Sequence, residues 1–292
     1  MLKGRATTIG FSAILMWAAL ALLTIYSAPV PPLLLNTICF AIGGTLGLIW
    51  CLTTGRLALL RTVPLKVYAF GTAGLFGYHL LYFSAFRLAP YAETGLIAYL
   101  WPLLIVLMSG LLPGERLRPL HVIGAMTGFC GSALILLNSG AGFAPERLPG
   151  FALAFLCALT WSGYSVLSRK LGQVPSESVT VFCLATAGLS FAAHLMFEVT
   201  EWPATSQAWL AVIGLGIGPV GLAFFFWDLG MKQGDIQLLG TASYAAPLLS
   251  TLALVFFGVA ELTTTIILAS LLITAGAALA AIAGRRPRRD QD

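Results

Sequence analysis

Charged side chains are scarce in this sequence. Only 9% of the 292 residues are Asp, Glu, Lys or Arg, whereas 59% are hydrophobic. A water-soluble core cannot bury that much apolar surface, so this balance excludes an ordinary soluble domain and indicates lipid as the main solvent. The net charge is +5, but the basic residues gather near the ends of apolar runs, and we expect no nucleic-acid partner.

Cysteine pairs and enzyme signatures are also lacking. The five cysteines fall in or beside apolar runs without a CxxC pair, and we interpret them as small hydrophobic residues. No HExxH, GxSxG or P-loop sequence occurs. The stretch GIGPVG at 216–221 formally matches GxGxxG, but it contains Pro219 and follows no predicted strand. We therefore expect neither an enzyme nor a metal or cofactor site.

Long apolar runs dominate what is present. A bilayer core of about 30 Å requires roughly 20 apolar residues per helix, and breaks with Pro, Gly or charge divide the chain at that spacing. We predict an all-α integral membrane protein, because strand-like alternation is absent. The first run could be a signal peptide, but its length and the span that follows favour a retained helix. The ten predicted transmembrane helices are residues 7–26, 31–53, 66–87, 92–112, 119–138, 150–169, 177–198, 207–229, 236–257 and 263–283.

Basic residues distribute unevenly between the predicted loops. With the N-terminus in the cytoplasm and ten alternating spans, 14 of the 16 Lys and Arg face the cytoplasm, and only Arg87 and Arg147 do not. This positive-inside bias predicts that both termini are cytoplasmic. We interpret RRPRR at 285–289 as a topology anchor and solvated tail rather than a site for anionic lipid.

The second half of the chain repeats features of the first at an offset of about 145 residues. YLWPLL at 99–104 returns as YAAPLL at 244–249. Five spans per half is an odd number, so the halves enter the membrane from opposite sides. Such inverted five-helix repeats are common in secondary transporters, although some channels share them. We place the first half at 1–144 and the second at 145–292, within one functional domain.

A proline recurs in the middle of the fourth and ninth predicted spans. Pro102 and Pro247 each remove a backbone donor and free the carbonyl four residues earlier, which must find a partner or line a wet cavity. The alternative is a packing kink without a ligand. We favour a cavity, because the tyrosines nearby also need hydrogen-bond partners. Gly95 and Gly240 lie seven residues before the prolines, and we expect all four residues to act as kinks or hinges.

Tryptophan and tyrosine occur in the middle of the spans. Lipid cannot satisfy their polar atoms there, so we predict that together they form the wall of a central pocket, although burial against a neighbouring helix is an equal alternative for any one of them. His79 has no carboxylate within a turn of its own helix, and we favour a neutral pocket residue over a proton relay. The predicted wall is Trp17, Tyr78, His79, Tyr82, Tyr99, Trp101, Trp161, Tyr164, Trp227 and Tyr244.

These features resemble a known family. Ten helices in two inverted halves, with Trp17 and Trp161 in the opening helix of each half, are similar to the EamA-type drug/metabolite transporter superfamily. Within it, YLWP, LTWSGYS, FFFWDLG followed by GDI, and SYAAPLLS resemble the bacterial aromatic amino acid exporters. The resemblance covers nearly the whole chain. It implies export of aromatic, and other neutral, amino acids across the bacterial inner membrane, through a cavity lined by the first, third, fourth, sixth, eighth and ninth spans.

Other functions stay open at this point. A carrier of another small metabolite or drug is the main alternative, although a nucleotide-sugar carrier would want a basic residue in mid-span and an organic-cation carrier an acidic one. A membrane-embedded enzyme would need a catalytic set that the sequence does not offer. We expect a small-molecule substrate and the lipid bilayer as partners. The oligomeric state, a monomer included, the coupling ion and the direction of transport stay open.

Overall fold

The computed structural model describes residues 2–136, 145–258 and 261–284. Within these ranges the chain forms α-helices joined by short 3₁₀ and π segments, without a strand. Helices are expected here, because a backbone in lipid must satisfy its own N–H and C=O groups. The predicted all-α class is therefore confirmed for the described part of the chain.

The helices are numbered along the chain. Up to residue 136 they are α1 (Lys3–Trp17), α2 (Leu20–Tyr26), α3 (Pro32–Thr53), α4 (Leu57–Leu60), α5 (Leu65–Leu88), α6 (Tyr91–Ala98), α7 (Trp101–Ser109) and α8 (Pro119–Leu136). From residue 145 they are η1 (Pro145–Arg147), α9 (Leu148–Lys170), η2 (Ser176–Ser178), α10 (Val179–Phe197), α11 (Ser206–Ile217), η3 (Gly218–Leu222), α12 (Ala223–Gln233), α13 (Ile236–Ala242), α14 (Ala245–Phe256) and α15 (Thr264–Gly284).

Several of these helical stretches can cross a membrane. By length and composition, six of the described stretches are long and apolar enough: Lys3–Tyr26, Pro32–Thr53, Pro145–Lys170, Ser176–Phe197, Ser206–Gln233 and Thr264–Ala283. Glu93–Ser109 and Pro119–Leu134 are shorter apolar helices. The chain is thus a multi-pass membrane protein.

Four of the predicted spans are interrupted rather than continuous. α1 gives way to α2 directly after Trp17, α6 to α7 at Tyr99, and α13 to α14 at Tyr244. In the fourth, the five-residue π-helix η3, which contains Pro219, separates α11 from α12. The stretch GIGPVG is therefore part of a distorted helix, as its lack of a preceding strand indicated.

The two repeated prolines begin helices instead of bending them. Pro102 is the second residue of α7 and Pro247 the third of α14. Proline lacks a backbone N–H. In the first turn of a helix this breaks no hydrogen bond, because the amides of that turn have no acceptor within the helix. The Ser243 carbonyl, which Pro247 was expected to free, accepts a hydrogen bond from the Ala246 amide at 3.0 Å. The predicted mid-helix kinks are thus breaks between two half-helices.

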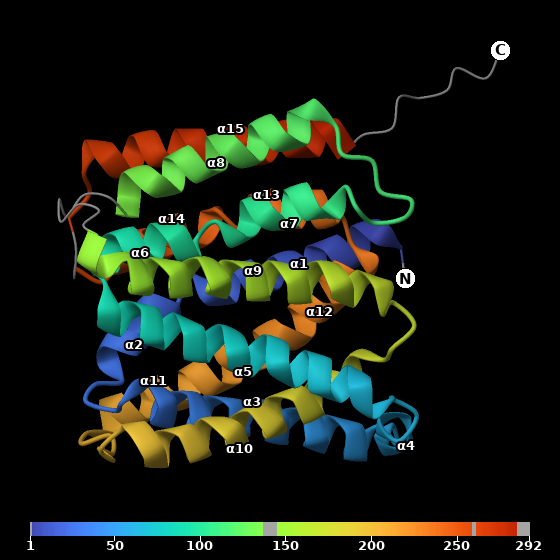
Figure 1. Cartoon of the computed structure of the whole chain (residues 1–292), viewed down its shortest axis with the longest axis vertical. Helices are drawn as coiled ribbons and strands as arrows, with labels where there is room; N and C mark the ends of the chain where they lie inside the picture. Colours follow the sequence, from blue (N-terminus) through green and yellow to red (C-terminus); the bar gives the residue numbers. More distant parts are fainter. Residues whose placement is uncertain (1, 137–144, 259–260, 285–292) are drawn as a thin grey trace.

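Figure 1 shows the helices side by side in one bundle. α8 and α15 pair at one edge, α3, α10 and α11 form the opposite edge, and α1, α9 and α12 lie between them. The α8–α15 pair is close: a Cβ on Gly124 would lie 2.6 Å from the Gly276 carbonyl oxygen. α1 begins and α15 ends at the same end of the bundle, and we call this the terminal end.

Candidate substrate cavity

A cavity of about 550 Å³ lies between the central helices. Its wall comes from α1, α2, α3, α5 and the α6–α7 break in the first half of the chain, and from α9, α11, η3, α12 and α14 in the second. All four helix interruptions border it, through Trp17, Tyr99, Pro219 and Ala246. Each interruption brings backbone groups without a regular helical partner next to this space.

Seven of the ten residues predicted for the pocket line this cavity. They are Trp17, Tyr78, His79, Tyr82, Tyr99, Trp101 and Trp161. They come from four separate predicted spans, and the fold brings them together around one volume. Their part in binding a ligand is not established by their position alone and stays a prediction.

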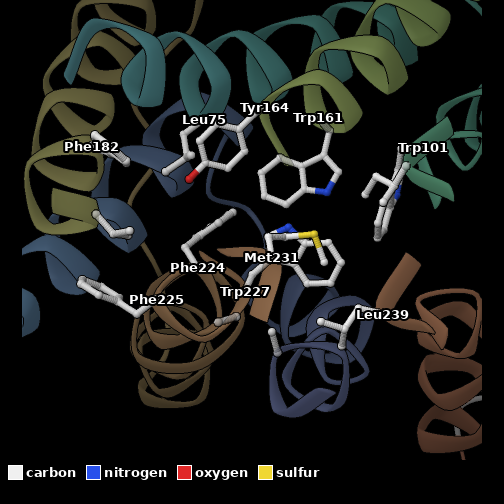
Figure 2. Packing of buried hydrophobic residues seen from close by; sticks show 14 of the residues in the cluster. Leu75, Trp101, Trp161, Tyr164, Phe182, Phe224, Phe225, Trp227, Met231 and Leu239 are labelled. Carbon is white, nitrogen blue, oxygen red and sulfur yellow. The ribbon is translucent and has the colours of Figure 1, made fainter. Parts of the chain in front are cut away.

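Tryptophans from four helices meet on one side of the cavity. The Trp17 ring centroid lies 6.1 Å from Trp101, 6.1 Å from Trp161 and 5.1 Å from Trp227. Figure 2 shows the last three rings close together in the core. The Trp17 indole N–H donates to the Pro219 carbonyl at 3.0 Å. This hydrogen bond joins the α1–α2 interruption in the first half of the chain to η3 in the second half.

A face of α5 adjoins the tryptophans, since the Tyr78 ring centroid lies 5.3 Å from that of Trp161. The ring centroids of Tyr78 and His79 lie 5.1 Å apart, and those of Tyr78 and Tyr82 lie 5.9 Å apart. His79 Nδ1 is 2.8 Å from the Leu75 carbonyl oxygen. A carbonyl can only accept, so Nδ1 carries the proton, and in the neutral ring Nε2 is a free acceptor.

Tyr164, Trp227 and Tyr244 are not part of the cavity wall, which corrects the prediction for these three. Trp227 is 1% exposed, lies behind Trp17, and donates its indole N–H to Ser165 Oγ at 3.0 Å. Tyr164 is 3% exposed and stacks on Trp161 and Phe70. Both are packing residues in the second layer.

Tyr244 has a different task in the fold. It is fully buried, and its hydroxyl accepts a hydrogen bond from the Leu103 amide at 3.0 Å. Leu103 is in the first turn of α7, where amides have no helical partner. The tyrosine of the second proline helix therefore caps the first one. Tyr99, its counterpart, lines the cavity instead, so the repeat is not symmetric here.

Several wall residues were missed from the sequence. Phe224 lines the cavity; it is the first residue of the FFFWDLG motif, but its apolar side chain gave no reason to place it in the wall. The polar side chains of Thr24, Asn36, Ser250 and Thr251 also line it. Asn36 could have been found, because an amide inside an apolar span needs a partner; its Nδ2 donates to Ser190 Oγ at 2.9 Å.

The predicted hinge residues occupy varied places. Pro247 lines the cavity, whereas Pro102 is buried in α7. Gly240 lets α13 approach α7, because a Cβ there would lie 3.0 Å from a Val106 methyl. Gly95 is buried in α6, and its carbonyl accepts from the Tyr99 amide at 2.8 Å. Whether they move is a prediction.

The cavity wall carries no formal charge. None of its lining residues is Asp, Glu, Lys or Arg. Throughout the described ranges, no group of three or more His, Cys, Asp or Glu could hold a metal ion. The wall can therefore bind a ligand through aromatic faces, hydroxyl dipoles and one imidazole, and it suits a molecule with no net charge.

The cavity extends toward the end of the bundle opposite the terminal end. Its lining residues include α2, the first turns of α3 and the last turns of α5, and these segments lie at that end in Figure 1. The cavity contains no lining residue from the first three turns of α1.

The terminal end is sealed by contacts between α1 and the α12–α13 connection. Lys3 pairs with Asp235 at 2.9 Å, and the Asp235 amide donates to Thr7 Oγ1 at 2.8 Å. A Cβ on Gly10 would lie 2.9 Å from the Gly230 Cα, so the two backbones touch. These contacts join the first half of the chain to the second.

A second group of polar contacts closes the same end around the last turn of α9. Arg169 pairs with Glu115, in the α7–α8 connection, and donates to the Met231 and Gly234 carbonyls at 3.0 and 2.8 Å. Beside it, Lys232 pairs with Asp228 at 2.8 Å with both side chains almost fully buried. The two residues lie four apart near the end of α12 and form an i,i+4 pair.

Comparison with known proteins agrees with this architecture. The chain is 54% identical over 289 residues to the aromatic amino acid exporter YddG of Ancylobacter novellus, covering 98% of this chain and 100% of that one. It is 27% identical over 267 residues to YddG of Salmonella typhimurium, covering 86% and 88%. A crystal structure with 54% sequence identity superposes with a TM-score of 0.92 and covers 97% of this chain and all of its own.

The family match falls on both halves separately, over residues 5–137 and 148–282. The family and these relatives are transporters, as expected from the sequence, and the chain is a transporter rather than an enzyme. Together with its apolar helices, these relatives make it a multi-pass protein of the bacterial inner membrane. The chain belongs to the EamA-like transporter family.

Proposed function

We propose that this transporter exports aromatic amino acids, and other neutral amino acids less well, through the central cavity. The observation that carries this proposal is the uncharged wall with nine aromatic or imidazole side chains around about 550 Å³. The volume is in the range of small-molecule sites. The likeness to the exporter of Ancylobacter novellus over almost the whole chain supports the same substrate class.

The cavity offers a partner for each part of such a substrate. The Trp and Tyr faces stack on the substrate ring, worth about 0.5–1.5 kcal/mol per good pair. A Trp face holds the ammonium group by a cation–π contact of about 1–2 kcal/mol once water is excluded. The hydroxyls of Tyr78, Tyr82 and Tyr99 can donate to the carboxylate, and the free Nε2 of His79 can accept from the ammonium.

The proposed topology has ten spans in two inverted five-helix halves. Interrupted helices count once, and α5 and α13–α14 add to the apolar stretches described above. The separate family matches at 5–137 and 148–282 support two halves. The boundary proposed at 144/145 falls at the edge of an undescribed segment, and the basic stretch at 285–289 lies outside the described residues. Positive-inside bias supports a cytoplasmic terminal end.

Transport then follows by alternating access. In the described state the cavity leads to the outer side, and the Lys3–Asp235 and Arg169–Glu115 contacts close the cytoplasmic side. Release of those contacts and closure of the outer end, about the helix interruptions, would expose the same cavity to the cytoplasm. An exporter needs weak binding in order to release its cargo, and neutral contacts provide it.

Purified protein in proteoliposomes tests the proposal. Liposomes preloaded with unlabelled phenylalanine should accumulate radiolabelled phenylalanine by counterflow, whereas liposomes preloaded with glutamate or lysine should not. Repeating the assay with and without a pH gradient tells whether protons are coupled. Equal counterflow with charged amino acids, or none with phenylalanine, tyrosine and tryptophan in correctly folded protein, would point to another small metabolite.

A further inference from the structure

A second, separate cavity lies on the side of the bundle. Its volume is about 600 Å³, and it shares no lining residue with the central cavity. We call it the lateral groove; its wall includes Ile9 and Ser12 of α1, Leu46 and Trp50 of α3, and Phe226 and Leu229 of α12. α1 packs on α12 and α3 packs on η3, and the groove is the space that these contacts leave.

The groove is apolar and faces the bilayer. Leu222, Phe226 and Leu229 are spaced so that they share one face of the helix, and all three are half-buried, whereas the neighbouring Phe225 is buried. Trp50 is 39% exposed. A half-buried apolar stripe within a membrane span has lipid chains as its only available solvent. An acyl chain is therefore the ligand whose shape and polarity match the wall.

The mouth of the groove is basic. Trp50 lies in the last turn of α3, at the terminal end, and the Arg56 guanidinium lies over its ring at 5.5 Å. Arg56 pairs with Glu177 at 2.8 Å but is 53% exposed, which leaves donors free for a second anion. Arg5 is exposed and lies four residues before Ile9 on the same face of α1.

We infer that the lateral groove binds an anionic phospholipid, with one acyl chain between α1 and α3 and its phosphate between Arg5 and Arg56. The acyl chain leaves one apolar environment, the bilayer, for another, the groove. Any preference of the groove among lipids therefore comes from the headgroup charge. The inference does not depend on the transported substrate. In the proposed topology, the site belongs to the cytoplasmic leaflet.

Photo-crosslinking in nanodiscs tests this inference. Full-length protein is placed in discs of phosphatidylglycerol or phosphatidylcholine with identical acyl chains, each containing a trace of the same lipid with a diazirine in the chain. Labelled peptides are then identified by mass spectrometry. We expect labelling of α1 near residues 9–12 and of α12 near 222–229 to be at least threefold higher with phosphatidylglycerol.

Matched variants identify the cause. Replacing both basic residues, Arg5→Gln with Arg56→Gln, should bring the two lipids to equal labelling. Arg61→Gln, at the same end of the bundle but outside the groove, should preserve the preference. Glu177→Gln should increase it, because Arg56 then lacks its competing partner. Ser12→Phe should fill the groove and remove α12 labelling with both lipids.

Equal labelling by the two lipids in the unchanged protein would overturn the inference. So would a preference that survives the double Arg substitution, or one that Arg61→Gln removes as well, because either result indicates a general surface charge effect. Each variant is first checked for a monodisperse elution profile. Should the double variant fail that check, Glu177→Gln and Ser12→Phe decide the matter.

Discussion

His79 and Tyr82 illustrate what single side chains contribute to the cavity. Both lie on one face of α5 and line the same volume. His79 has its Nδ1 proton committed to the Leu75 carbonyl, whereas no described hydrogen bond engages the Tyr82 hydroxyl. Free polar atoms beside aromatic faces are what a zwitterionic ligand requires, so these two residues are where recognition can be tested most directly.

Tyr82→Phe keeps the ring and removes only the hydroxyl. We expect the KM for phenylalanine to rise about fivefold, the effect of one lost hydrogen bond of about 1 kcal/mol, at unchanged expression. Counterflow assays in proteoliposomes measure it. Phe257→Ala, 59% exposed at the end of α14, is the control and should have little effect. If alanine at His79, Tyr82 and Trp101 in turn left transport intact, these residues would serve packing alone.

Tyr244 gives a contrasting prediction. Tyr244→Phe leaves the amide of the half-buried Leu103 without its acceptor, which costs about 1–3 kcal/mol of stability. The midpoint of thermal unfolding in detergent should therefore fall, while the KM for phenylalanine stays the same. A raised KM with an unchanged midpoint would show that the hydroxyl contacts the substrate after all.

Tyr99 and Tyr244 mark a limit of what the sequence can predict. Both lie in mid-span beside a repeated proline, and the pattern predicts that both need hydrogen-bond partners. That need is met in two ways, by the cavity for Tyr99 and by a backbone amide for Tyr244. Helical spacing tells which residues share a face, but which layer they occupy depends on the packing of other helices.

At the scale of the elements, the interrupted helices are the main feature. The sequence predicted bends in the two proline helices, and the structure has two-residue interruptions of the regular helix at those places. No proline or glycine predicts the interruption after Trp17, because the next residues are Ala18 and Ala19. A tertiary contact lies at this place: the Trp17 indole N–H donates to the Pro219 carbonyl in another helical segment. Local sequence alone could not reveal it.

Pro102→Ala tests the role of the α6–α7 break. Alanine restores the missing amide and favours one continuous helix, so we expect transport to fall severalfold while the amount of folded protein in the membrane changes little. Initial rates, divided by the protein recovered in a monodisperse peak, give the comparison. Unchanged transport per folded molecule would mean that the proline serves helix packing only.

At the scale of the whole molecule, the proposed transport cycle requires the contacts at the terminal end to open when the cavity faces the cytoplasm. The Asp235 amide donates to Thr7 Oγ1 at 2.8 Å, so these two residues are neighbours across the closed end and cysteines in their places lie within reach of a disulfide. We expect Thr7→Cys with Asp235→Cys, in a Cys130→Ser background, to lose transport on oxidation and regain it with dithiothreitol. Binding of phenylalanine from the outer side should persist.

Single-cysteine variants serve as controls for that experiment and should transport under both conditions. If the oxidised double variant transported normally although mass spectrometry showed the crosslink, the contacts between α1 and α13 would not be part of the moving seal. The Lys3–Asp235 pair would then be a static surface interaction of the kind that contributes little.

The proposed topology makes its own prediction. Cysteines introduced at residue 142 and at the C-terminus should react with a membrane-impermeant maleimide from opposite sides of the membrane. Five spans separate the two positions, an odd number. Intact cells and inverted vesicles distinguish the sides, and labelling of both cysteines from the same side would contradict the inverted arrangement.

The uncharged wall of the central cavity has an electrical consequence. A zwitterion carried alone through a neutral binding space moves no net charge, whereas each elementary charge crossing the membrane would exchange about 2.3 kcal/mol per 100 mV with the potential. Transport would then be electroneutral: the membrane voltage would neither accelerate nor slow it, and no current would be recorded during turnover. The direction of net flow would be set by the ratio of amino acid concentrations on the two sides. Such a protein would lower the internal concentration of aromatic amino acids in a cell that overproduces them.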